Sequence, residues 1–112
     1  MRMTFFDFAV FQSCDFSAGD LQFLSFAGAT INDCTFEGSE LVSINFGGSV
    51  ISNSNFSNTN QYNSRFISAR INASNFVDCN LKRTNFVKTH LEDISFKFSN
   101  TAEAIFEMEE YS

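Results

Sequence analysis

Phenylalanine recurs in this chain at an unbroken interval of ten residues. The eleven members of the series are Phe6, Phe16, Phe26, Phe36, Phe46, Phe56, Phe66, Phe76, Phe86, Phe96 and Phe106. Midway between them stand Phe11, Leu21, Ile31, Leu41, Ile51, Gln61, Ile71, Leu81, Leu91, Thr101 and Tyr111. A bulky position therefore recurs every five residues, with Gln61 and Thr101 as polar exceptions, and such a period indicates a repeat architecture.

The period of five excludes a helix. Five helical residues advance by ~500°, a net ~140°, so successive Phe side chains would point all around the circumference. The residue two places before each bulky position is usually small, as in Ala9, Cys14 and Ala29. In a strand these two positions face one side. The next small position lies three residues further on, so each five-residue unit must contain a corner.

Four corners would close a square coil of twenty residues. A two-sided coil of ten fits the Phe period equally well, and the residues alone leave both open. In the larger coil, residues twenty apart stack, which gives two opposed Phe ladders and two walls rich in Leu and Ile. Such a coil buries its ladders only by stacking on its neighbours, so it is not stable alone.

The units resemble those of the pentapeptide-repeat family, whose motif is a small residue, Asp or Asn, Leu or Phe, and two variable residues. Matching units include Cys14-Asp15-Phe16-Ser17-Ala18 and Ser54-Asn55-Phe56-Ser57-Asn58. The resemblance covers about residues 4–108, so residues 1–112 are expected to form a single domain. It implies an all-β, right-handed quadrilateral parallel β-helix of about five coils, with twenty residues in each.

A few residues depart from the motif. Leu24, Ile44 and Ile94 are large where small residues are usual, so we expect a locally wider wall or a different turn. Gln61 interrupts a Leu ladder, either as an amide satisfied by neighbouring groups or as an opening in the wall. Residues 101–112 are compatible with a final coil, a short helical cap or a dimer contact.

Two clusters of outward-facing residues are candidate interfaces. Phe5, Phe8 and Phe23 would form an apolar rim at the N-terminal end, which either associates with another copy or is capped by the N-terminal segment. Lys82, Arg83 and Lys88 lie at neighbouring corners and form either a modest basic patch or an ordinary solvated surface.

The residues predict no catalytic, metal-binding or cofactor-binding site. His90 takes an outward position above Arg70, and Cys14, Cys34 and Cys79 take small inward positions as core residues. No zinc spacing or glycine-rich phosphate loop is present, so an enzyme is not expected. A cytoplasmic protein without a membrane partner is expected for three reasons. The cysteine count is odd, the apolar start of the chain contains an acid, and no apolar stretch is long enough to span a membrane.

The net charge of -6 argues against nucleic-acid binding. The first hypothesis is a binding module or scaffold with an unknown protein partner. The second follows from the resemblance: quinolone-resistance members of the family form end-to-end homodimers and imitate DNA at bacterial gyrase and related type II topoisomerases. A rod of roughly 25 Å would need on the order of 14 negative charges to match duplex DNA. The chain carries fewer negative charges than such an imitation of DNA would need. This favours the scaffold hypothesis, with the chain as either a monomer or an end-to-end homodimer.

Overall fold

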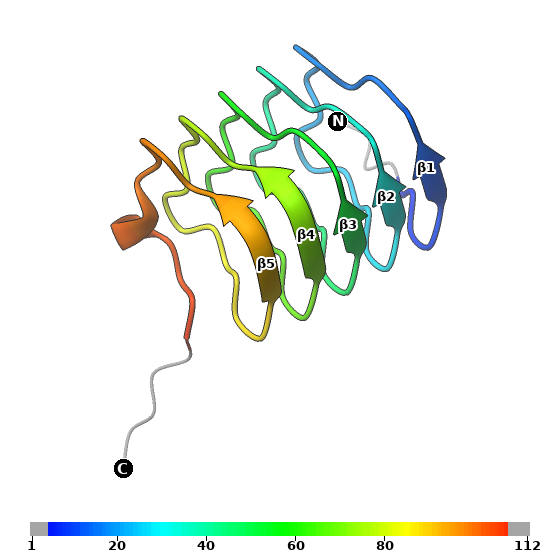
Figure 1. Cartoon of the computed structure of the whole chain (residues 1–112). Coiled ribbons are helices and arrows are strands. Elements are labelled where there is room, and N and C mark those ends of the chain that lie inside the picture. The colour runs from blue at the N-terminus through cyan, green and yellow to red at the C-terminus, as the bar shows by residue number, and fades with distance from the viewer. Residues whose placement is uncertain (1–4, 108–112) are drawn as a thin grey trace.

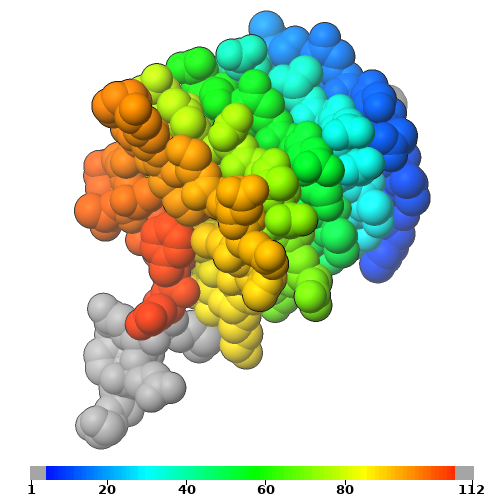
Figure 2. All heavy atoms as spheres, viewed as in Figure 1, coloured from blue at the N-terminus to red at the C-terminus, as the bar shows by residue number. Residues whose placement is uncertain are grey.

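The computed structural model describes residues 5–107, which wind into a stack of similar turns (Figure 1). Each turn contributes one strand to a single parallel sheet in the order β1-β2-β3-β4-β5. These strands are β1 (Val10–Gln12), β2 (Thr30–Asn32), β3 (Val50–Ser52), β4 (Arg70–Asn75) and β5 (His90–Ser95). The space-filling view shows the turns as successive bands along the stack (Figure 2).

Each turn contains twenty residues and has four sides. Phe11 pairs with Ile31, and Ile31 with Ile51, so neighbouring turns are in register at a spacing of twenty. Backbone bridges also join Phe5 to Ser25, Asp15 to Thr35 and Asp20 to Glu40. A two-sided coil of ten is therefore excluded. We name the sides by their inward residue in the first turn: the Phe6 side, the Phe11 side (which carries β1–β5), the Phe16 side and the Leu21 side.

Every corner depends on a residue with positive φ. The second variable residue of each unit from Phe8 to Phe98 has φ between 51° and 72°, and only three of these residues are glycine. At many corners the residue after it closes a turn, as where the Ala9 N–H donates to the Phe6 carbonyl at 3.1 Å. None of the nineteen corner residues is Val, Ile or Thr, the residues that tolerate this conformation least.

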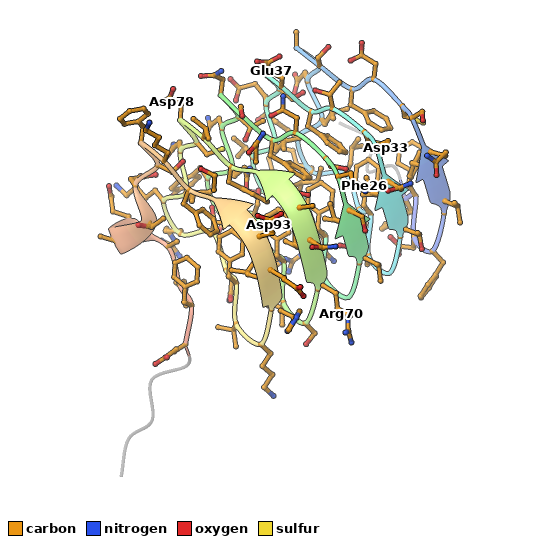
Figure 3. All side chains as sticks on the ribbon, viewed as in Figure 1. Phe26, Asp33, Glu37, Arg70, Asp78 and Asp93 are labelled. Atoms are coloured by element: carbon orange, nitrogen blue, oxygen red, sulfur yellow. The ribbon has the colours of Figure 1, made fainter. Side chains whose placement is uncertain are left out.

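The interior is filled by the two Phe ladders and the aliphatic walls between them. Within a ladder the rings stack face to face, with 4.7 Å between the centroids of Phe36 and Phe56. Between ladders they meet edge to face, as for Phe46 and Phe56 at 5.7 Å and 89°. Phe26, Phe36, Phe46, Phe56, Phe66, Phe76 and Phe86 are between 0% and 2% exposed. Figure 3 places Phe26 inside the coil and Glu37, Arg70 and Asp78 outside.

The ladder residues of the end turns are not fully buried. Phe6, Phe16 and Phe96 are partly exposed, and Phe106 is 38% exposed. The expectation that all eleven rings lie in the core is therefore wrong for Phe106 and only partly right for these three. The cause is that a terminal ring has a neighbouring turn on one side only.

The described C-terminal residues combine two of the predicted forms: one short 3-10 helix, η1 (Thr101–Glu103), and a continuation of the coil in which Ile105 bridges to Asn85. The helix remains bonded to the preceding turn, because the Leu81 N–H donates to Asn100 Oδ1 at 2.6 Å and the Arg83 N–H donates to the Glu103 carbonyl at 3.0 Å. The last part of the predicted cap, residues 108–112, lies outside the described residues, as does Tyr111 of the series of bulky positions.

Two of the large residues at small positions, Leu24 and Ile44, have longer turn bonds but not the different turn type that was one expectation, because φ at the corners before them is in the common range. The closing N–H···O distances are 3.4 Å at Leu24 and 3.3 Å at Ile44, compared with 3.0 Å at Ala29 and Ser39. Ile94 instead lies within the longer strand β5. Branched side chains thus fit the wall at the cost of a weaker turn bond.

Candidate interaction surfaces

The interior of the described turns is packed with side chains, and the cysteines lie at its small inward positions. All three cysteines are free thiols. Burial raises the pKa of the Cys34 thiol and of the Cys79 thiol, which disfavours the reactive thiolate. Within residues 5–107, no group of three or more His, Cys, Asp or Glu side chains is arranged to hold a metal ion.

Gln61 is the one fault in the packed interior of the described turns. Its side chain is fully buried. Its amide nitrogen donates to Thr59 Oγ1 at 2.7 Å, but its Oε1 atom has no hydrogen-bond partner. The alternative of an opening in the wall is wrong, because the wall is closed around Gln61. Neighbouring groups in the described turns satisfy the amide nitrogen but not Oε1.

Many of the polar residues that precede a bulky position have two roles. The side chain accepts the N–H two residues on, as Asn55 Oδ1 does from Ser57 at 2.9 Å. On the Leu21 side the same position also forms a ladder of hydrogen bonds between turns. Asn60 donates to Glu40 at 3.1 Å, Asn80 to Asn60 at 3.0 Å and Asn100 to Asn80 at 3.2 Å. This ladder holds neighbouring turns in register.

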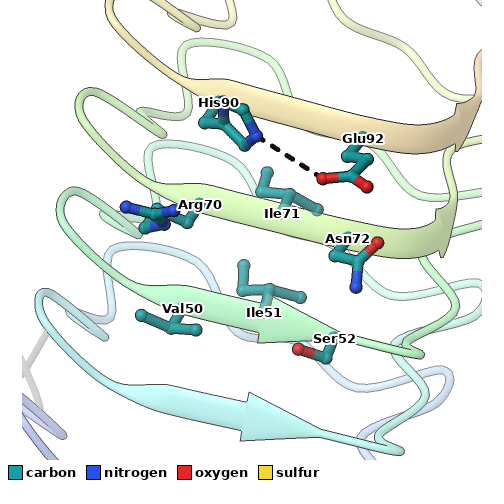
Figure 4. Close-up of a pocket in the computed structure, with 8 residues that line it drawn as sticks. All are labelled: Val50, Ile51, Ser52, Arg70, Ile71, Asn72, His90 and Glu92. Atoms are coloured by element: carbon teal, nitrogen blue, oxygen red, sulfur yellow. Dashed lines mark ion pairs between the residues drawn. The ribbon is translucent and has the colours of Figure 1, made fainter.

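A groove of about 220 Å³ crosses β3, β4 and β5 on the Phe11 side (Figure 4). It runs between two rows of outward side chains. One row consists of Val50, Arg70 and His90, and the other of Ser52, Asn72 and Glu92. His90 Nε2 lies 3.6 Å from Glu92 Oε2, and both side chains are exposed. This ion pair closes one end of the groove.

The groove differs from the upstream half of the same side. Over β1 and β2 the polar side chains bond to one another: Asn32 donates to Gln12 at 3.0 Å, Asn53 to Asn32 at 3.3 Å, and Gln12 to Asp33 at 3.3 Å. In the described part of the chain, the side chains of Ser52, Arg70 and Asn72 make no such bonds. Their donors are therefore free to meet a partner.

The predicted interface residues are all on the outside. Phe5, Phe8 and Phe23 are 63%, 80% and 38% exposed. The N-terminal end also presents Val10, at 73%. The alternative that the N-terminal segment caps this rim concerns residues 1–4, outside the described residues.

The three basic residues do not form one flat patch. Lys82 and Arg83 belong to the Leu21 side, whereas Lys88 stands at the far corner of the next side. Sequence reasoning also missed Phe98, which is 74% exposed and lies under Lys97 Nζ at 5.0 Å. The signal was present, because Phe98 stands at the second variable position of its unit, which is a corner in every unit from Phe8 to Phe98.

The family model for pentapeptide repeats matches residues 29–66 and 74–106 with eight copies. The chain belongs to the pentapeptide-repeat family and has its fold, the right-handed quadrilateral parallel β-helix. The first turn, which the family model does not match, follows the same register.

Among solved structures, the chain is similar to HetL from the cyanobacterium Nostoc, a pentapeptide-repeat protein involved in the regulation of heterocyst differentiation. The TM-score is 0.86 at 17% identity, over 91% of this chain and 48% of HetL. The chain thus spans about half the length of HetL. It is also similar to QnrB1, a plasmid-mediated fluoroquinolone-resistance protein, with a TM-score of 0.54, 19% identity, and coverage of 87% of this chain and 70% of QnrB1. No match is found among curated proteins.

Within the described residues, no helix has the length and apolar character needed to cross a membrane.

Proposed function

We propose that the chain is a non-enzymatic protein-interaction module that binds its partner through an outer side of the coil. The observation that carries this proposal is the filled interior. The seven central ladder rings are at most 2% exposed, and the walls between them are closed. Binding is therefore left to the outer sides, whose side chains repeat at ~4.8 Å from turn to turn.

The groove on the Phe11 side supports the same proposal. It places the unengaged donors of Ser52, Arg70 and Asn72 on two adjacent strands, β3 and β4, that are fixed in register. Donors held on a rigid support lose little entropy when a partner binds. The groove is smaller than the ~300–1,000 Å³ usual for small-molecule sites, which favours a protein surface as the partner. A cytoplasmic location is part of the proposal, supported by the three free thiols.

Site-specific photo-crosslinking would test the proposal. A photoreactive amino acid replaces one exposed residue on each side in turn: Arg65, Asn72, Glu37 and Tyr62, on the Phe6, Phe11, Phe16 and Leu21 sides. In the cells that produce the chain, we expect one partner species to be captured from one side or from two adjacent sides. Capture from no side, or equal capture from all four, would contradict a side-specific module.

A second candidate, imitation of DNA at bacterial type II topoisomerases, is favoured by one observation. Residues 5–64 contain six acids and no Lys or Arg. The basic residues between 65 and 97 interrupt this acidic surface and weaken the candidate. Titration into a gyrase supercoiling and quinolone-cleavage assay would distinguish the two proposals. Inhibition or protection at low micromolar concentration would favour imitation of DNA, and no effect at high concentration would exclude it.

A further inference from the structure

The outward residues of the Leu21 side form three columns along the coil. The first column is Asp20, Glu40, Asn60, Asn80 and Asn100, which are bridged turn to turn from Asp20 to Asn80. The second column is Gln22, Val42, Tyr62, Lys82 and Ala102. The third, at the corner, is Phe23, Ser43, Asn63 and Arg83, followed by Glu103 of η1. Residues in one column are twenty apart and therefore lie on successive turns.

Charge is segregated over the first four turns of these columns. The acids Asp20 and Glu40 lie on the first and second turns, and the bases Lys82 and Arg83 lie on the fourth. A third acid, Glu103, belongs to η1, beyond these four turns. Lys82 and Glu40 are two turns apart, or about 9.6 Å along the coil, and do not pair. In the described part of the chain, no ion pair engages any of these four residues. Tyr62 on the third turn is 37% exposed and Val42 on the second is half-buried, so an apolar strip separates the acids from the bases.

We propose that the Leu21 sides of two copies of this chain pack against each other in antiparallel orientation. The two-fold axis lies in the interface, parallel to the strands and midway between the turns of Leu41 and Gln61. Such an axis reverses the order of the turns but keeps each column opposite itself. The interface is then isologous, so every contact occurs twice.

This axis brings complementary groups together. Lys82 of one copy meets Gln22 and the neighbouring Asp20 of the other, while Arg83 lies over the Phe23 ring. Tyr62 packs on Val42, and Glu40 faces the amide of Asn60. The contacts combine charge pairs, a cation–π pair and an apolar centre.

The complementarity selects this axis over its neighbour. An axis shifted by half the spacing between turns, through the Gln61 turn, would set Lys82 against Val42 beside Glu40, and would move Arg83 from the Phe23 ring to Ser43. It would keep a charge pair but lose the cation–π contact, and the acid Glu103 would face Phe23 instead. The chosen axis places no like charges opposite each other. Because it uses the Leu21 side, the inference does not rest on the function proposed above.

The contact area is small, and this limits how tightly the two copies are expected to bind. Four turns at ~4.8 Å by five residues at ~3.3 Å give a flat area of roughly 300 Å² on each copy. Stable complexes bury about 800 Å² on each partner, so this dimer is expected to be weak and dependent on concentration.

Analytical ultracentrifugation of the full chain and two charge variants would test the inference. The acidic variant carries Lys82→Glu and Arg83→Glu, and the basic variant carries Asp20→Lys and Glu40→Lys. The wild type should show a rising dimer fraction from about 10 µM to about 1 mM. Each variant alone should remain monomeric, because like charges then face each other. An equimolar mixture should form a heterodimer, because both ends of the contact again pair opposite charges.

The mixture separates the proposed contact from misfolding, since a misfolded variant could not recover dimerisation. The matched control is the double variant Glu37→Lys and Lys97→Glu on the Phe16 side, which should dimerise like the wild type. A wild type that stays monomeric to about 1 mM would overturn the inference. A dimer that both charge variants retain would also overturn it, and would point to contact at the coil ends.

Discussion

The central turns and the end turns of the coil have the same sequence pattern but different packing. Phe56 stacks between Phe36 at 4.7 Å and Phe76 at 4.8 Å and is fully buried. Phe106 occupies the same unit position but stacks only on Phe86, at 5.1 Å, and is 38% exposed. The comparison shows that the motif alone does not bury its Phe. Burial is supplied by the turns on either side, as in other solenoids.

The order of the rings also loosens at the end of one ladder. Its rings are nearly parallel in the middle, at 4° for Phe36 and Phe56, whereas Phe76 and Phe96 are tilted by 39°. The other ladder stays stacked to its last ring, with 9° between Phe86 and Phe106. Because the end rings are the exposed ones, stability should fall from the middle of the coil to its ends.

Among the changes that test this difference between central and end turns, truncation of a core Phe should have the largest effect. Phe56→Ala should lower the free energy of unfolding by about 3–5 kcal/mol, because it opens a cavity between two stacked rings. Phe106→Ala should cost about 1 kcal/mol or less, because it removes an exposed ring that stacks on one side only. Urea denaturation measures both. Ser57→Ala, beside Phe56 but outside the ladder, is the control and should be near neutral; similar losses for all three variants would contradict the assigned burial.

The sequence predicted the ladders because stacking depends on one strong period. It could not predict the partial exposure of Phe6 and Phe106, since the repeat pattern is the same in every unit and does not depend on the number of neighbouring turns. The corner conformation was also missed. Its signal lies in the frequency of Gly, Asn and Asp at the second variable position, together with the absence of β-branched residues there. The groove on β3–β5 depends on which surface donors are unengaged, which no local pattern specifies.

Gln61 is an exception within the central turns, and its replacement would make that region uniform. Gln61→Leu should raise the free energy of unfolding by about 1–3 kcal/mol, because it removes a buried Oε1 atom without a partner and restores the Leu ladder. Thermal and urea denaturation measure the gain. The reverse change, Leu41→Gln on the neighbouring turn, should destabilise the chain. A loss of stability in Gln61→Leu would mean that the amide is satisfied after all.

The corners differ from the walls in what they tolerate. Asn58 is exposed with φ 58°, so Asn58→Val should cost about 1–2 kcal/mol, since a β-branched residue fits this conformation poorly. Asn58→Gly should change stability by less than about 0.5 kcal/mol. The control is Ser57→Val, one residue earlier, where φ is not positive. If both Val variants lowered the free energy of unfolding equally, side-chain size rather than corner geometry would be the cause of the loss.

The smallest expected effect is a pH dependence that distinguishes the first turn from a central turn. Asp15 in the first turn and Asn55 in the central turn hold the same position in their units. Both accept an N–H from the residue two places on, at 2.8 Å from Ser17 and 2.9 Å from Ser57. Only the aspartate titrates. Hydrogen bonds from the Ser17 hydroxyl and N–H hold the pKa of the Asp15 carboxyl below its ordinary value. A lowered folded-state pKa stabilises the fold above the ordinary value, and that contribution is lost as pH falls through the folded-state pKa.

Ser17→Ala should therefore raise the pKa of Asp15 part of the way back, because the backbone N–H still donates. An NMR titration of the carboxyl carbon measures it, with Ser57→Ala as the control that leaves Asp15 unchanged. An unchanged pKa in Ser17→Ala would show that the hydroxyl does not bond to this carboxylate in solution. With the shift confirmed, the acid-sensitive element would lie in the exposed first turn, whereas the central turn, which has an amide at this position, would keep the same bond at every pH.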